Sequence, residues 1–245
     1  SEKDFKKFLL KKKNLRINSS MEAYFKQPIE LMNLSTSIIK ILKSKNINSL
    51  RDVVSCYQSV DDFEAVAQIF EHLQVVPTPD SYHAFQERVG DRGLAVARGP
   101  IAASPVHLIL HELVAMDQFF YLYMDVRDAL HALAARMEPF FHAALDALVS
   151  SDAEVIFWGG NYDQDLTWPP FFEEEITPWL QMVSDRLHKA GKHLLTHTDG
   201  ENKDLLSLYA ACRFDVAESV CPAPMTKCTL SELREGMGPK TTIWG

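Results

Sequence analysis

The sequence is poor in the features that mark several large classes of protein. Its four cysteines, irregularly spaced in 245 residues, are too few for a disulfide scaffold. No apolar run approaches the roughly 20 residues of a membrane span, and no apolar block follows the basic N-terminus as in a secretory signal. No glycine-rich phosphate-binding fingerprint follows a strand-like run, which argues against a nucleotide-binding Rossmann domain. We therefore expect a cytoplasmic globular protein that makes no contact with membranes.

Positive charge is concentrated in the first fifty residues. They contain 11 Lys and Arg against 4 Asp and Glu, a balance of +7, whereas the remainder contains 14 against 29, a balance of −15. The composition changes at the same place, from Lys, Asn, Ser and Ile to Ala, Val, Leu, Asp and Glu. This contrast predicts a basic helical segment over residues 1–56 and a second domain over residues 57–245.

The basic segment raises the question of nucleic acid as a partner. Lys11–Lys13 and their neighbours could attract phosphate charge, although a solvated arm has the same composition. Farther along, Ser35 is a candidate N-cap, and the apolar spacing favours two short helices. Residues 28–55 resemble the first half of the C-terminal domain found in the alpha chain of RNA polymerase. The positions of that domain's DNA-contacting arginine and asparagine are occupied by Ser37 and Lys40, so we do not expect nucleic acid binding.

After residue 60 the chain alternates strand-like and helical stretches. Short apolar runs predict strands over Leu94–Arg98, Glu154–Trp158, His193–His197, Asp215–Val220 and Thr241–Gly245. Helical spacing predicts a long helix capped by Asp125, a helix from Thr177–Pro178 to Gly191, a helix around Leu205–Tyr209, and a helix opened by the capping-box pair Thr229 and Glu232. This rhythm predicts an α/β protein with a parallel sheet, either open and doubly wound or closed as a barrel.

Residues that carry chemistry follow the ends of these strands. His197 and Asp199 follow one apolar run, Glu218 and Cys221 lie at the end of the next, and each set ends in turn residues. Carboxyl ends of parallel strands lie at one rim, where α/β proteins bind ligands. An imidazole, a thiolate and a carboxylate there would suit zinc, whereas Asp199 and Glu218 would suit acid/base work. The alternative to zinc binding and to acid/base catalysis is that these side chains only make hydrogen bonds within turns.

An ordered series of motifs resembles the uroporphyrinogen decarboxylase superfamily, which includes cobalamin-dependent methyltransferases. The motifs are Gly159–Asn161, Pro178–Lys192, His197–Gly200, Phe214–Val216 and Ile243–Gly245. The match covers about residues 85–245. The resemblance implies a (β/α)8 barrel of the TIM type, with its site at the carboxyl rim. The barrel looks incomplete, because only five strands are recognisable, and the open edges would favour a homo-oligomer.

The resemblance also implies roles for particular residues. In the methyltransferase branch, a zinc-binding His corresponds to His197, the first zinc-binding Cys is replaced here by Asp199, and a later ligand falls near Cys221. The decarboxylase branch carries an arginine motif that nothing in residues 1–84 matches. We assign metal binding to His197 and Cys221, and catalysis to Asp199 and Glu218. The expected substrate contacts are Trp158, Asn161, Asp163 and Trp244.

Three functions remain open at this point. The first is zinc-assisted methyl transfer to a thiol from a corrinoid or another methylated substrate, with a small molecule or a corrinoid protein as partner. The second is metal-free decarboxylation of a tetrapyrrole-like substrate, which needs no cofactor. The third is a catalytically inactive interaction protein, built from the basic segment and a degenerate barrel.

Overall fold

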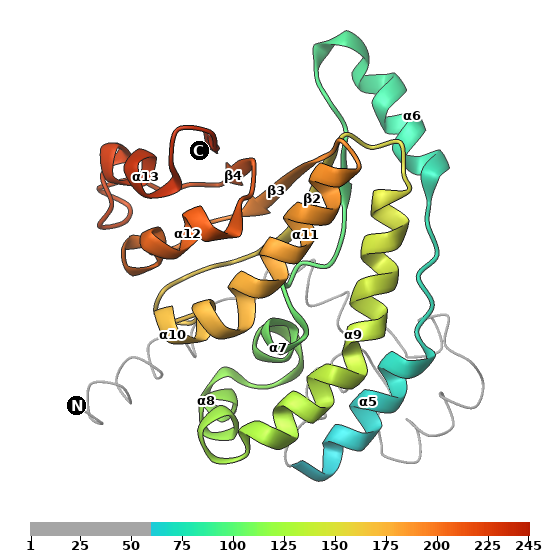
Figure 1. Cartoon of the computed structure of the whole chain (residues 1–245), viewed down its shortest axis with the longest axis vertical. Helices are drawn as coiled ribbons and strands as arrows, with labels where there is room; N and C mark the ends of the chain where they lie inside the picture. Colours follow the sequence, from blue (N-terminus) through green and yellow to red (C-terminus); the bar gives the residue numbers. More distant parts are fainter. Residues whose placement is uncertain (1–59) are drawn as a thin grey trace, which may run out of the picture. The chain divides into compact units, whose positions relative to one another are not determined.

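The computed structural model describes residues 60–245, which form an α/β protein (Figure 1). Backbone contacts divide these residues into two compact units. The first contains the described residues up to Leu73 together with Ile109–Ala134, and the second contains Gln74–Leu108 and Ala135–Gly245. The expected basic segment over residues 1–56, its boundary and its likeness to the polymerase domain lie outside the described residues.

The first unit is helical. It contains the 3-10 turn η2 (Val60–Asp62), α5 (Phe63–His72), the π-helical turn η4 (Ile109–Leu113), α8 (Met116–Asp125) and the beginning of α9 (Arg127–Val149). The prediction that Asp125 caps the long helix is wrong. Asp125 is the last residue of α8, and α9 begins two residues later, at Arg127. The sequence pattern did not predict α8.

The second unit is built on a five-stranded sheet. Its strands are β1 (Val96–Arg98), β2 (Val155–Gly160), β3 (His193–His197), β4 (Val216–Glu218) and β5 (Thr242–Trp244). Neighbours in the sheet follow the order of the chain, and every pair is parallel. The five predicted strands are therefore confirmed, with bounds that differ by up to two residues at either end.

In the second unit, two helical elements precede β1, and the others connect the strands that follow. They are α6 (Pro79–Val89), η3 (Gly90–Arg92), α7 (Pro105–Leu108), α10 (Pro169–Phe171), η5 (Phe172–Ile176), α11 (Thr177–Lys189), η6 (Lys203–Leu205), α12 (Leu206–Cys212) and α13 (Leu230–Met237). Two sequence signals are confirmed. Pro178 lies in the first turn of α11, and the Thr229 side chain accepts from the Glu232 N–H in a complete capping box.

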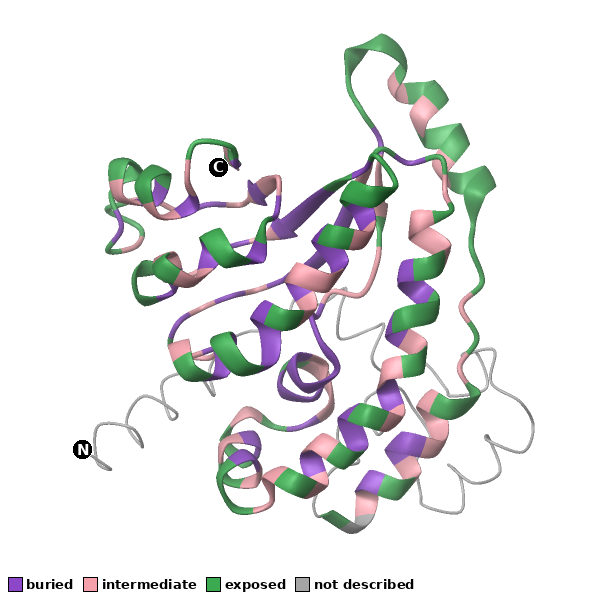
Figure 2. Ribbon diagram, viewed as in Figure 1, coloured by how far each residue is buried: buried purple, intermediate pink, exposed green. Residues whose placement is uncertain are grey.

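The two faces of the sheet have different surroundings. On one face Ile156, Leu194, Thr196 and Ala217 are wholly buried, and Figure 2 shows β3 as a buried strand. Helix α11 contacts β3 on this side and also packs against α12. On the other face, the residues at the carboxyl ends of β1, β4 and β5 are partly or largely exposed. The core therefore lies between the sheet and the helices, and the second face is the one that can meet a ligand.

Parallel strands in chain order, joined by helices, are the arrangement found in part of a TIM-type barrel. The structure shows the α/β class and the parallel sheet, and it is compatible with a partial barrel of this type. Among residues 60–245, no helix combines the length and the apolar character needed to cross a membrane.

Candidate functional site

The candidate site lies on the more exposed face of the sheet, at the carboxyl ends of its strands. Arg98 of β1 pairs in register with Phe157 of β2, and Glu218 of β4 pairs with both His197 of β3 and Trp244 of β5. Residues paired in register on adjacent strands point to the same face. A row of charged and aromatic side chains therefore crosses this end of the sheet.

His197 lies at the centre of this row, and each of its ring nitrogens faces a carboxylate. Its Nδ1 donates to Oε2 of Glu218, and its Nε2 lies 3.4 Å from Oδ1 of Asp199. Because a carboxylate can only accept, the contact with Glu218 fixes a proton on Nδ1. In the neutral ring, the lone pair of Nε2 then faces Asp199.

Asp199 completes an unusual pair of atoms. Its Oδ1 is buried and, among residues 60–245, has no hydrogen-bond partner. A neutral imidazole nitrogen and a carboxylate oxygen are both acceptors, so two acceptors face each other at 3.4 Å. Either a proton on Nε2 or a bound cation would satisfy both atoms. The two atoms are therefore acceptors that a donor group or a cation would contact.

The charge on Glu218 supports this interpretation. Burial would raise the pKa of the Glu218 carboxyl, but hydrogen bonds from His197 and Ser219 and the nearby charges of His197 and Arg98 together outweigh it. The pKa therefore lies below its usual value. The Ser219 hydroxyl donates to Oε1 at 2.7 Å, so both oxygens of the carboxylate are occupied. Glu218 orients His197 and stabilises a positive charge on its ring.

The loop that carries Asp199 is held by buried polar groups. Asn202 is 1% exposed, and its amide donates to the carbonyls of Thr198 and Gly200, at 2.9 Å each. The Tyr209 hydroxyl donates to the side-chain oxygen of Asn202. Gly200 has φ of +88°, which favours glycine. The position of Asp199 is thus set from α12 through Tyr209 and Asn202.

Close packing also fixes His197. A side chain at Gly160 would bring a Cβ atom within 2.7 Å of the His197 Cβ. The pairing of β2 with β3 is irregular between Phe157 and Gly160, and such irregularities re-aim side chains. The missing side chain at Gly160 and this irregularity allow His197 to approach β2.

Asn161 and Asp163 lie in the neighbouring loop after β2. The Asn161 N–H donates to the carbonyl of His197 at 3.0 Å. Asp163 Oδ1 accepts from the N–H of Asp165 at 2.9 Å, and Oδ2 from the N–H of Glu201 at 3.4 Å. These contacts hold the loops beside His197, and substrate binding by either residue stays a prediction.

The two tryptophans proposed as substrate contacts have different environments. Trp158 is wholly buried, donates from Nε1 to the carbonyl of Ala103 at 3.1 Å, and packs edge-on against Phe141. This places it in the core between sheet and helices. Trp244 is 56% exposed and lies next to Glu218 in the sheet. Of the two, only Trp244 is accessible from the face that bears His197.

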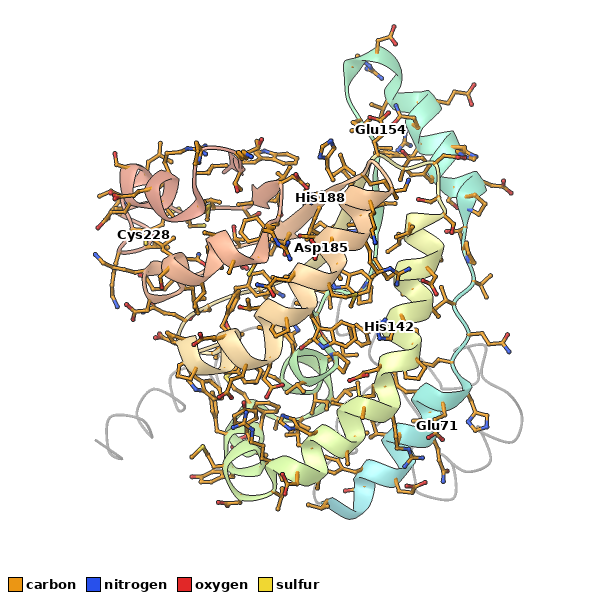
Figure 3. The ribbon with its side chains drawn as sticks, in the orientation of Figure 1. Glu71, His142, Glu154, Asp185, His188 and Cys228 are labelled. Carbon is orange, nitrogen blue, oxygen red and sulfur yellow. The ribbon has the colours of Figure 1, made fainter. Side chains whose placement is uncertain are left out.

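Cys212, Cys221 and Cys228, the cysteines that the structure describes, do not join His197 in a metal-binding group. In the part of the chain that the structure describes, no three His, Cys, Asp or Glu side chains gather closely enough to hold a metal. The thiol of Cys221 faces the carbonyl of Ser219 at 3.5 Å. Cys212 and Cys228, the latter labelled in Figure 3, are buried, and burial raises the pKa of Cys212 to about 12. Metal binding by Cys221 stays a prediction, whereas His197 and Asp199 offer two suitable donor atoms.

Several solved structures are similar to this chain. One is described as a methyltransferase from Methanosarcina mazei, and it matches with a TM-score of 0.50 over 91% of this chain and 54% of its own, at 16% identity. The two proteins share a fold. This chain spans about half the length of that methyltransferase. No protein-family model matches the chain, and no curated protein does.

The sequence pattern did not single out Arg98 or Ser219. Arg98 lies at the end of β1, with its guanidinium 4.8 Å from the centre of the Phe157 ring. The sequence signal was a cation ending an apolar run just before Gly99–Pro100. His188, labelled in Figure 3, lies near the carboxyl end of α11 and donates to Asp215 Oδ2 at 2.8 Å, so it belongs to a surface ion pair rather than to this row.

Proposed function

We propose that this chain forms part of a methyltransferase, with its site at His197, Asp199 and Glu218. One observation carries the proposal: two acceptor atoms, Nε2 of His197 and Oδ1 of Asp199, face each other beside a carboxylate that fixes the proton on the other ring nitrogen. The structural likeness to a methyltransferase supports the reaction class.

The reaction would be the attack of a thiol sulfur on a methyl carbon. The new C–S bond forms as the bond from the methyl carbon to its donor breaks, and the bonding electron pair leaves with the donor. The donor would be a corrinoid or another methylated molecule. The thiol must lose its proton first, because the thiolate is the nucleophile.

His197 and Asp199 would supply this activation in one of two ways. Without metal, the lone pair of Nε2 would accept the proton of a thiol, and Glu218 on Nδ1 would stabilise the imidazolium that results. With zinc, the same lone pair and Oδ1 of Asp199 would hold the metal ion instead, with Glu218 orienting the ring through Nδ1. Bound zinc would lower the pKa of a thiol and hold it as thiolate.

The test uses the full chain with methylcobalamin and 2-mercaptoethanol, with and without added zinc. Loss of the methylcobalamin absorbance in the dark, together with the S-methyl product by mass spectrometry, would support the proposal. Asp199→Ala and His197→Ala should abolish turnover, whereas Asp165→Ala, an exposed carboxylate in the neighbouring loop, should leave it unchanged. Turnover that is equal in all variants would overturn the assignment.

Two further measurements separate the rival functions. Elemental analysis of the purified chain should give about one zinc per chain, lost in His197→Ala and Asp199→Ala; the same measurement on Cys221→Ala tests the predicted thiolate ligand. Turnover of uroporphyrinogen without added metal would instead support decarboxylation, in which Asp199 would stabilise a protonated pyrrole. A folded chain inactive in both assays would support the interaction protein.

A further inference from the structure

A cavity of about 900 Å³ opens beside β1, within the second unit. Its walls are mainly apolar and come from three elements: Tyr82 and Phe85 of α6, Val96 and Ala97 of β1, and Phe140 and Leu148 of α9. Helix α6 buries none of its own residues, as the absence of buried positions along it in Figure 2 shows. This volume lies within the range of small-molecule sites.

Among the described charged groups that line this cavity, some are paired with an opposite charge, and one is not. His83 and Asp152 line it and pair with each other at 2.9 Å, so the charge of Asp152 has a partner. Arg98 also lines it, and among the described residues its guanidinium makes no hydrogen bond or ion pair. Stacking on Phe157 restrains the guanidinium and leaves its N–H donors available.

Arg98 also connects the cavity with the candidate site. The Phe157 ring lies 4.8 Å from the guanidinium carbon of Arg98 and 6.3 Å, between ring centres, from His197. An anion bound by Arg98 would therefore lie one side chain away from His197. The negative charge of Glu218, close enough to interact with Arg98, disfavours a doubly charged phosphate more than a singly charged carboxylate.

We propose that Arg98 binds the carboxylate of an organic monocarboxylate whose apolar body occupies this cavity. The geometry then places the carboxylate end toward His197, so the reacting atom of the substrate lies near its carboxylate. The inference rests on the proposed function only for its statement that this ligand is the substrate. The binding itself requires neither methyl transfer nor zinc.

Four probes separate the parts of this proposal: hexanoate, hexan-1-ol, acetate and hexyl phosphate. Binding to the full chain at low ionic strength is followed by ligand-observed NMR. Hexanoate should bind at least about tenfold more tightly than hexan-1-ol, which lacks the charge, or acetate, which lacks the body. Hexyl phosphate should bind more weakly than hexanoate.

Variants locate the binding. Arg98→Gln should weaken hexanoate about tenfold and leave hexan-1-ol unchanged, because only the charged contact is lost. Ala147→Phe, which fills the cavity at a partly exposed position of α9, should weaken hexanoate but not acetate. Arg92→Gln is the matched control, since Arg92 is exposed and, within the described part of the chain, donates to the carbonyls of Val89 and Arg88.

Four results would overturn the proposal. Two concern the ligand: hexan-1-ol binds as tightly as hexanoate, or hexyl phosphate binds more tightly than hexanoate. Two concern the variants: Arg98→Gln binds hexanoate with the affinity of the unchanged chain, or Ala147→Phe alters only self-association, which would assign the cavity to a second copy of the chain. Comparing two probes on Arg98→Gln remains decisive if Ala147→Phe does not fold. Because the readout is binding, hexanoate can bind as expected in a chain that shows no methyl transfer, and the reverse result is also distinguishable.

Discussion

Tyr209→Phe removes a single hydroxyl and tests how the Asp199 loop is held. Tyr209 is 1% exposed, and its hydroxyl donates to the side-chain oxygen of Asn202, which is also 1% exposed. The variant leaves that oxygen buried without a donor. A buried acceptor left unsatisfied costs about 1–3 kcal/mol of unfolding free energy. For a chain of this size, each kcal/mol lowers the unfolding midpoint by roughly 2–4 °C.

The measurement is thermal unfolding followed by circular dichroism, together with native-state hydrogen exchange. The midpoint should fall by a few degrees, and the amides of residues 198–202 should exchange faster, because Asn202 holds two carbonyls of this loop. Tyr121→Phe is the matched control, since Tyr121 is 63% exposed and its change should stay within about 0.5 kcal/mol. Equal midpoints for the two variants would refute the role of the Tyr209 hydroxyl.

Three other predictions concern single side chains. Glu218→Gln should destabilise the chain at neutral pH, because a carboxyl whose pKa is lowered by folding stabilises the fold at pH values above its pKa in the unfolded chain. The difference in unfolding free energy between the two chains should shrink below about pH 4, where the carboxyl of Glu218 becomes protonated. Urea unfolding measured at several pH values checks this. Lys192→Met should lower the free energy of unfolding in urea by about 2–4 kcal/mol, because the Lys192 ammonium donates to two carbonyls at 2.6 and 2.7 Å. Lys189 is exposed, so Lys189→Met should leave this free energy almost unchanged. Equal losses in the two variants would contradict this account. Thr229→Ala should cost about 1 kcal/mol through loss of the capping box, and an unchanged denaturation midpoint would argue against it.

Local signals in the sequence predicted local structure well. The capping box at Thr229 and the turn at Gly191 depend on residues a few positions apart, and both are confirmed. Each apolar run marked a strand, because burial on both sides of part of the sheet selects continuous apolar residues. The expected cap Asp125 failed because two consecutive helices, α8 and α9, adjoin there, and a cap signal does not say which helix it serves.

The candidate site was harder to predict because it depends on which way each side chain points. The strand around Trp158 is apolar at every position, so its sequence does not distinguish the helix-covered face from the open one. The structure places Trp158 in the core and Trp244 on the open face. Arg98 was missed because a cation at the end of an apolar run does not show that its side chain lies against Phe157, the ring that also approaches His197. Long-range pairing of strands supplies that information.

The alternation along β3 has a consequence for how this chain can change over evolutionary time. Leu194 and Thr196 face the helices, whereas Leu195 and His197 belong to the face that carries the row of polar groups. Substitutions at adjacent positions therefore act on different surfaces, one set on the packed core and the other on the face with the polar row. Changes at alternate residues of one strand could then alter the chemistry of that face while the folded framework is inherited intact.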